Sequence, residues 1–114
     1  MDANQYQKMA GRTLIDKPDA QYTDHEIMMV WNAIGLAGEA GEVADHIKKG
    51  VFHQHGIDKD KLVKELGDVL WYVAALCTKL DVSMGDVMNT NVEKLLKRYP
   101  NGYNSTDSIN RGSQ

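Results

Sequence analysis

The sequence predicts an all-α fold, and two observations carry that prediction. The 114-residue chain has two prolines and few β-branched or aromatic runs, which disfavours a β-rich fold. Its apolar residues recur every three to four positions over long segments, which is the spacing of one face of an α-helix. A chain of this length forms one domain with a single core, which we place at residues 1–103. The polar tail 104–114 is expected to be mobile.

Four helices are expected from the apolar pattern and the residues that interrupt it. Their expected ranges are about 3–15, 24–49, 58–80, and from 83 to the stretch "RYPNG". Thr23 or Asp24 is the expected N-cap of the second helix. The stretch "SMGD" resembles a capping box at the start of the fourth. A linker with glycine at each side separates the second and third helices.

The second and third helices have apolar arcs that are wider than one neighbouring helix can cover. On the third helix, one stripe lies beside a second stripe that contains Leu70 and Cys77. The first stripe comprises Leu62, Leu66, Val69, Val73, Leu76 and Leu80. Four helices, two of them short, offer few neighbours within one chain. We therefore expect self-association as a homodimer or a larger homo-oligomer.

Composition and charge exclude several classes of protein. The net charge of −3 provides no basic surface for nucleic acid, so no nucleic-acid partner is expected. A single cysteine, Cys77, cannot form a disulfide framework or a multi-thiolate metal site. No signal-peptide pattern and no apolar run of membrane-spanning length is present, so no membrane partner is expected. The expectation is a soluble, cytoplasmic protein.

Two pairs of acids lie at the edges of these apolar faces. Glu39 and Glu42 in "EAGE" share one column of the second helix, and Glu65 and Asp68 in "ELGD" share one column of the third. A short linker favours antiparallel packing, which would bring the four acids together. Clustered carboxylates repel one another unless a positive charge lies between them, and a hard divalent cation such as Mg²⁺ prefers oxygen ligands. The alternative is that each pair belongs to the solvated face of its helix.

Three glycines, Gly38, Gly41 and Gly67, lie beside the acids. Each costs a helix about 1 kcal/mol relative to alanine. We expect them either to let helices approach closely or to leave room for a ligand around the ion.

Three stretches, "GLAGEAGEVADHIKKGVFH", "KLVKELGDVLWYVAALC" and "NVEKLLKRYPNGY", occur in that order. Together they strongly resemble the MazG-like all-α nucleoside triphosphate pyrophosphohydrolases, especially the short single-domain forms. The likeness covers roughly residues 27–103. It implies a four-helix-bundle-like MazG fold, assembled as a homodimer or tetramer. It also implies hydrolysis of a nucleoside triphosphate between the α and β phosphates, giving a monophosphate and pyrophosphate, in a house-cleaning or pool-balancing role.

The resemblance also implies roles for the four acids. Glu39, Glu42, Glu65 and Asp68 would be the catalytic residues and would hold Mg²⁺, with Mn²⁺ as a substitute. The family's first motif is often written with two consecutive glutamates before x-x-E, and here Gly38 takes the place of the first. We therefore expect the four acids that are present to hold the metal ion without that additional acid.

Candidates for substrate binding come from the fourth helix and from two aromatic residues. Lys94 and Arg98, in one column with Asn91, match the family's "N..K...R" stretch. Tyr72, one turn after Asp68, and Trp31, two turns before Glu39, are candidates for stacking on the nucleotide. The alternative for both aromatic residues is packing in a core or an interface.

Three other residues close to the acids in the sequence are given ordinary interpretations. Lys49 and Lys61 are interpreted as solubilising charge, and His46 as an incidental imidazole on a helix surface.

Two other functions remain open. The first is a non-catalytic nucleotide-binding or protein-interaction helical module of the same fold, which the missing acid at Gly38 favours. The second is a related hydrolase that acts on a phosphoribosyl-linked nucleotide. The sequence leaves open the preferred base and sugar, canonical or modified nucleotides, dimer or tetramer, the number of metals, and which glutamate orients water.

Overall fold

A computed structural model describes residues 1–16, 21–54 and 56–102, and these ranges contain helices and no strand. The helices are α1 (Ala3–Gly11), α2 (Asp24–Phe52), α3 (Lys59–Lys79) and α4 (Met84–Arg98). The all-α prediction is confirmed, and each expected helix is present. None of these helices is both long enough and apolar enough to span a membrane. The predicted tail, residues 104–114, lies outside the described residues.

The helices begin where side chains accept hydrogen bonds from backbone N–H groups of the first turn. Thr23 Oγ1 accepts from the Glu26 N–H at 3.1 Å, while the Glu26 carboxylate accepts from the Thr23 N–H at 3.0 Å. Ser83 Oγ accepts from the Asp86 N–H at 2.9 Å. These bonds satisfy donors that have no partner within the helix, and one such cap contributes about 1 kcal/mol. Thr23 is therefore the N-cap of α2, and α4 starts where "SMGD" predicted.

Two helix ends differ from the prediction. α1 ends at Gly11 rather than near residue 15, because the N–H and the hydroxyl of Thr13 both donate to the Ala10 carbonyl, each at 3.1 Å. α2 continues to Phe52 instead of ending near residue 49. Gly50 makes room for the linker there, since a Cβ on it would lie 2.9 Å from the Gly56 carbonyl oxygen. The Gly56 N–H donates to the Gly50 carbonyl at 3.1 Å, which folds the linker back against α2.

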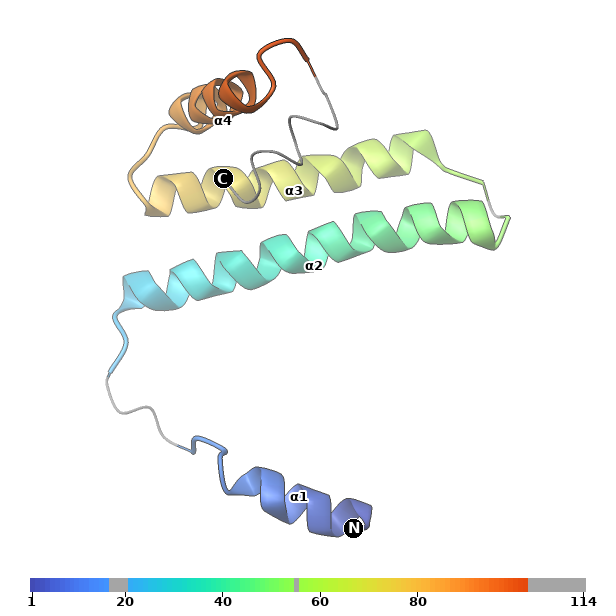
Figure 1. The fold of residues 1–114 in the computed structure, drawn as a ribbon, viewed down its shortest axis with the longest axis vertical. Helices are drawn as coiled ribbons and strands as arrows, with labels where there is room; N and C mark the ends of the chain where they lie inside the picture. The colour runs from blue at the N-terminus through green and yellow to red at the C-terminus, as the bar shows by residue number, and fades with distance from the viewer. Residues whose placement is uncertain (17–20, 55, 103–114) are drawn as a thin grey trace.

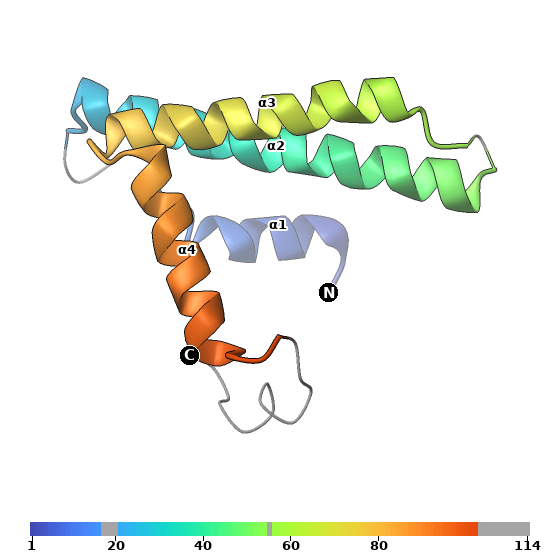
Figure 2. The ribbon, with the colours of Figure 1, turned by 90° about the horizontal axis from the view of Figure 1, so that it is seen from above.

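α2 and α3 form an antiparallel hairpin and are the two helices that pack extensively against each other. Both views show them side by side, joined at one end by the short linker (Figure 1; Figure 2). α1 lies apart from the hairpin (Figure 1), and α4 turns away from the end of α3 (Figure 2). Among the described residues, one chain thus supplies a hairpin and two outlying helices. The expected four-helix bundle is not closed within a single chain.

The two helices of the hairpin meet along a seam whose positions repeat after three and then four residues, as in a coiled coil. The seam positions are Asn32, Leu36, Glu39, Val43 and His46 on α2, and Leu62, Glu65, Val69, Tyr72 and Leu76 on α3. Asn32 is 5% exposed, and its side-chain amide donates to the Met28 carbonyl at 2.8 Å. Polar and apolar residues therefore share the interface. Glu39 and Glu65 lie within the seam, whereas the sequence placed them at the edge of the apolar face.

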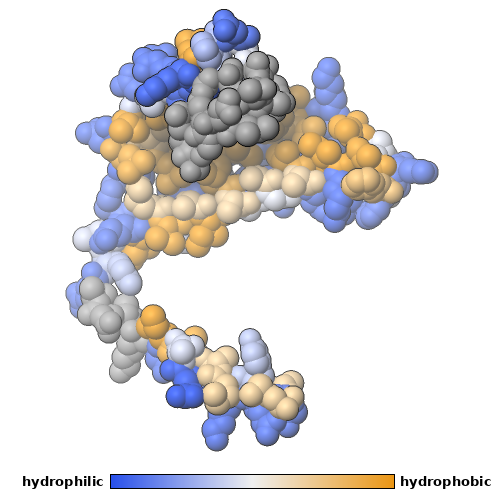
Figure 3. All heavy atoms as spheres, in the orientation of Figure 1, coloured by the Kyte–Doolittle hydropathy of each residue, from blue (hydrophilic) through white to orange (hydrophobic). Residues whose placement is uncertain are grey.

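Much of the predicted apolar arc is open to solvent. Leu66 and Leu80, expected in one stripe with seam residues, are 47% and 57% exposed because they lie to one side of the seam. α2 likewise exposes Val30 and Ile34, and apolar surface follows both helices of the hairpin (Figure 3). The radius of gyration is 20.4 Å, compared with about 13 Å for a compact domain of this length. One chain leaves its largest apolar surfaces uncovered.

The backbone of α2 lies directly under the ring of Tyr72 at Gly35. A Cβ at Gly35 would overlap this ring, with the ring carbon Cδ1 only 2.8 Å away. A Cβ at Gly38, three residues later, would meet no atom within 4 Å. Packing therefore requires glycine at Gly35 but not at Gly38.

We expect Gly35→Ala to lower the free energy of unfolding by about 1–3 kcal/mol, because the new methyl group displaces the Tyr72 ring. The matched control Gly38→Ala should leave stability unchanged or raise it by up to about 1 kcal/mol through helix propensity. Urea unfolding followed by circular dichroism measures both changes. Equal stability of the two variants would show that the ring does not pack on this glycine.

Candidate functional site

The four predicted carboxylates come from α2 and α3, at matching positions along the two antiparallel helices. The contact of the Tyr72 ring with Gly35 sets the register of the hairpin. One helical turn further along the antiparallel pair, Glu39 on α2 faces Asp68 on α3. One turn beyond that, Glu42 is level with Glu65. The two acidic motifs therefore lie at the same part of the hairpin.

The charges of these acids act on one another. Burial raises the pKa of the half-buried Glu39 above its ordinary value, and the negative charges of Asp68, Glu42 and Glu65 raise this pKa further, in that order. A like charge shifts a pKa in this direction only when it is close. The four carboxylates therefore share one electrostatic environment, in which an ionised Glu39 is unfavourable without a nearby positive charge.

Glu65 carries a buried oxygen with no donor. Its Oε2 atom accepts no hydrogen bond, although the side chain is only 12% exposed. His46 Nδ1 lies 3.6 Å away, which is beyond hydrogen-bond length. A buried carboxylate oxygen without a partner is costly, and such an atom in a folded protein calls for an explanation.

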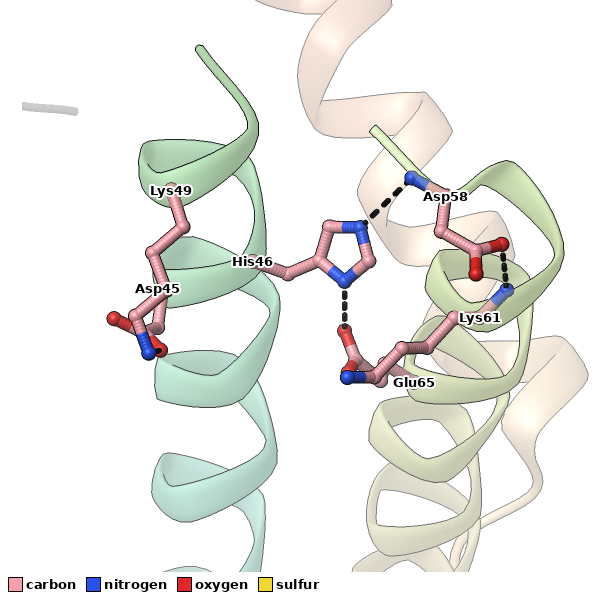
Figure 4. Close-up of polar contacts among 6 residues, drawn as sticks. All are labelled: Asp45, His46, Lys49, Asp58, Lys61 and Glu65. Carbon is pink, nitrogen blue, oxygen red and sulfur yellow. Dashed lines mark hydrogen bonds and ion pairs between the residues drawn. The ribbon is translucent and has the colours of Figure 1, made fainter. Parts of the chain in front are cut away.

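His46 connects α2 to the start of α3. Its Nε2 atom accepts a hydrogen bond from the Asp58 N–H at 3.2 Å, while Nδ1 points to Glu65 (Figure 4). The imidazole is 10% exposed, so the expected place of His46 on the helix surface is wrong. The sequence did contain a signal, since His46 follows Glu39 by seven residues and so occupies the same seam position one heptad later.

The donor set fits a hard divalent cation. All four side chains offer carboxylate oxygens, which are the ligands that Mg²⁺ prefers. The unpartnered Glu65 oxygen and the repulsion felt by Glu39 both fit a positive charge at this place. In the described part of the chain, no three acidic, histidine or cysteine side chains stand close enough together to hold an ion. Binding an ion therefore requires these side chains to turn toward one another.

A polar groove of about 310 Å³ lies beside these acids at the linker end of the hairpin. Its lining includes Glu42, Glu65 and two lysines, Lys49 and Lys61. The Lys49 ammonium lies 2.8 Å from the Asp45 carboxylate, and this hydrogen bond raises the pKa of Lys49 (Figure 4). Lys49 is thus paired within its own helix, which agrees with its interpretation as ordinary charge.

The predicted phosphate-binding residues are not brought to the acids within one chain. Asn91, Lys94 and Arg98 belong to α4, which does not pack along the hairpin (Figure 2). A nucleotide on the acidic part of the hairpin would meet them only if α4 came from another copy or moved.

The two predicted aromatic residues occupy different environments. Tyr72 is half-buried, with its ring on Gly35 and edge-on to Trp71 at a centroid distance of 5.0 Å. Trp31 is 67% exposed and lines an apolar groove of about 470 Å³ with Ile34 and neighbouring residues of α2. Tyr72 is therefore part of the hairpin packing, and Trp31 is open to a ligand or a second chain.

The glycines beside the acids have free space around them. A Cβ at Gly38, Gly41 or Gly67 would meet no atom within 4 Å. Of the two roles expected for them, close helix approach within the chain is wrong, and Gly35 provides it instead, under the Tyr72 ring of α3. The free space around these glycines is compatible with their other expected role, which is to leave room for a bound group.

Comparison with known proteins identifies the family. The model of the MazG nucleotide pyrophosphohydrolase domain matches residues 31–103, from within α2 to beyond α4, including both acidic motifs. The chain belongs to this MazG family. No solved structure matches it significantly.

The chain is also similar to two proteins whose names state no function. It is 37% identical to the "Gene 37 protein" of Mycobacterium phage L5, over 97% of this chain and 100% of that protein. It is 34% identical to the "Uncharacterized protein YvdC" of Bacillus subtilis (strain 168), over 56% of this chain and 69% of that protein. Neither name states a substrate.

We expect Glu39→Gln to raise the thermal unfolding midpoint of the metal-free MazG protein at pH 8. The pKa of Glu39 is raised in the folded state, so the folded protein holds more protons than the unfolded chain between the ordinary and the raised pKa. Stability conferred by the protonated carboxyl is therefore present below the ordinary pKa and is lost as the pH rises through the raised value. The advantage of the glutamine variant should accordingly grow as the pH rises through that window and be complete above it.

Asp45→Asn is the matched control, since the hydrogen bond from Lys49 lowers the pKa of Asp45. Its neutralisation should lower the midpoint at pH 8, which is the opposite direction. Differential scanning calorimetry in EDTA across pH 3.5–8 measures both. A lower midpoint for Glu39→Gln at pH 8 would mean that the carboxylates do not repel one another.

Proposed function

We propose that this MazG protein is a Mg²⁺-dependent nucleoside triphosphate pyrophosphohydrolase. It would cleave a (deoxy)nucleoside triphosphate between the α and β phosphates to give the monophosphate and pyrophosphate. The observation that supports this most is the facing of two acidic pairs across the α2–α3 hairpin in a chain of this family. A triphosphate is strongly negative, so four carboxylates attract it only together with cations. A house-cleaning or pool-balancing role fits such a reaction.

Each acid has a task in this proposal. Glu39, Glu42, Glu65 and Asp68 would hold Mg²⁺, or Mn²⁺ in its place. The bound ion supplies positive charge that offsets the charge of the triphosphate and of the leaving pyrophosphate. Glu39 or Glu42 would also accept a hydrogen bond from the attacking water and orient it toward the α-phosphorus. The open space at Gly38 and Gly41 leaves room for phosphate groups beside them.

Trp31 and residues of α4 would complete the substrate site. The exposed Trp31 ring lies two turns before Glu39 on α2, where it can stack on the nucleotide base. Asn91, Lys94 and Arg98 would contact the phosphates from a neighbouring copy, because α4 of the same chain turns away from the hairpin. Tyr72, packed on Gly35, would support the acidic face rather than contact the base directly.

The purified protein with Mg²⁺ should release pyrophosphate, and not orthophosphate, as the first product from at least one nucleoside triphosphate. Glu42→Gln combined with Asp68→Asn should lower this rate by about 100-fold or more, because one ligand is lost from each facing helix. A coupled pyrophosphate assay across canonical and modified nucleotides measures the rate. Asp45→Asn, which changes an acid in the same groove outside the proposed metal set, should retain activity within about threefold of wild type.

Orthophosphate as the primary product, or full activity of the double variant, would contradict the proposal. If the nucleotides bind in the presence of Mg²⁺ but remain intact, the non-catalytic nucleotide-binding module becomes the better interpretation. Calorimetry on the same nucleotide panel distinguishes that outcome from an absence of binding.

We also propose that the protein is a homo-oligomer. Its accessible surface is 9777 Å², compared with about 6200 Å² for a compact monomer of this mass. The excess is several times the roughly 800 Å² that each partner buries in an interface of standard size. The exposed apolar residues of the hairpin, including Val30, Ile34 and Leu70, would pack against a second copy. Such packing would close the four-helix bundle that one chain leaves open.

Light scattering of the wild type should give a mass of at least twice 12.7 kDa. Ile34→Asp should shift the mass toward that of the monomer, because it places a charge in the apolar surface of the hairpin. The control His25→Asp places the same side chain at an exposed polar position in the first turn of α2, and it should leave the assembly intact. A wild type that is monomeric at 100 µM would exclude this assembly.

A further inference from the structure

The two ring nitrogens of His46 face two different polar groups, and the one at Nε2 forms a hydrogen bond. Nε2 accepts from the Asp58 N–H at 3.2 Å, and Nδ1 lies 3.6 Å from Glu65 Oε2 (Figure 4). Asp58 is itself fixed, since it is the N-cap of α3 and its side chain accepts from the Lys61 N–H at 3.1 Å. The first turn of α3 therefore fixes the imidazole, whose other nitrogen faces the Glu65 carboxylate.

The hydrogen bond from Asp58 determines which ring nitrogen of a neutral imidazole carries hydrogen. A nitrogen that accepts from an N–H group must present its lone pair, so Nε2 is bare and the hydrogen is on Nδ1. The Nδ1–H group then faces the buried Glu65 Oε2 atom, which accepts no hydrogen bond in this structure. The backbone of α3 thereby selects the tautomer that can donate to Glu65.

A residue that only packed between the two helices would not need a ring nitrogen directed at Glu65. His46 occupies the seam position that Glu39 and Asn32 hold one and two heptads earlier, so this side of the seam is polar, but neither of those residues requires a donor at position 46. A histidine there adds a donor directed at a proposed metal ligand. Groups that hydrogen-bond to a ligating carboxylate orient it and tune its affinity for the ion.

We propose that His46 is a positioning residue whose Nδ1–H would donate to the Glu65 carboxylate when that side chain turns to hold a divalent cation. The inference rests on the proposed function, because it takes Glu65 to be a metal ligand. It adds that the linker sets the orientation of the imidazole, through the Asp58 N–H. The hairpin turn and the acidic site are thereby coupled by one side chain.

Two variants separate the contacts of the imidazole. In His46→Asn the amide nitrogen takes the place of Nδ1, so the donor to Glu65 is kept and the acceptor for Asp58 is lost. In His46→Gln the amide oxygen reaches the place of Nε2, so the acceptor for Asp58 is kept and the donor to Glu65 is lost. Binding of Mn²⁺ without nucleotide, followed by the electron paramagnetic resonance of the free ion, is the readout. His25→Asn, in the exposed first turn of α2, is the control.

His46→Gln should weaken Mn²⁺ binding by about 10- to 100-fold, while His46→Asn should remain within about threefold of wild type. Urea unfolding of both variants should show similar stabilities, because each keeps one contact. In the metal-free wild type, nitrogen NMR should find the His46 hydrogen on Nδ1. Undiminished Mn²⁺ binding by His46→Gln, equal weakening by both variants, or hydrogen on Nε2 would each overturn the inference.

The result for the wild type separates this inference from the proposed function. If the wild type binds no Mn²⁺, the metal-dependent function fails and the role of His46 fails with it. If the wild type binds Mn²⁺ and releases pyrophosphate while His46→Gln binds it equally well, only the role of His46 is refuted.

Discussion

The main physical constraint on the structure is the presence of acids inside the seam between α2 and α3. Glu39 and Glu65 occupy positions that a stable hairpin would fill with leucine, and Asp68 and Glu42 lie next to them. Burial and mutual repulsion make this arrangement unfavourable, as the raised pKa of Glu39 shows. Such a cost is retained where carboxylates serve a purpose other than packing, and a shared cation is the group that offsets it most directly.

Other features of the hairpin limit that cost. The Asp58 N–H fixes the His46 imidazole through Nε2, and Nδ1 of this ring lies 3.6 Å from the buried Oε2 atom of Glu65. Gly35 lets the Tyr72 ring pack closely one turn away from the acids, which secures the two helices on that side. The acids therefore lie between two fixed points, the ring of Tyr72 and the linker held by Gly50.

The same seam explains why one chain leaves so much apolar surface open. Because polar side chains occupy part of the α2–α3 contact, residues such as Ile34 and Leu70 face outward instead of filling it. α1 and α4 do not cover them, since neither packs along the hairpin. Self-association and catalysis are linked in our proposal, because the copy that covers the apolar surface would also present Lys94 and Arg98.

The sequence by itself determined the helices and the two acidic motifs, because helical periodicity, the Thr23 and Ser83 caps and the motif spacing are all local properties. It did not determine which face of α2 meets α3, since apolar arcs of similar width are available on several sides. Tertiary packing decided that, and it moved Glu39 and Glu65 from the edge into the seam. It also decided the environment of His46, because the contact with Asp58 forms only when the linker folds back. Relations between residues on different helices depend on this register, which no local pattern specifies.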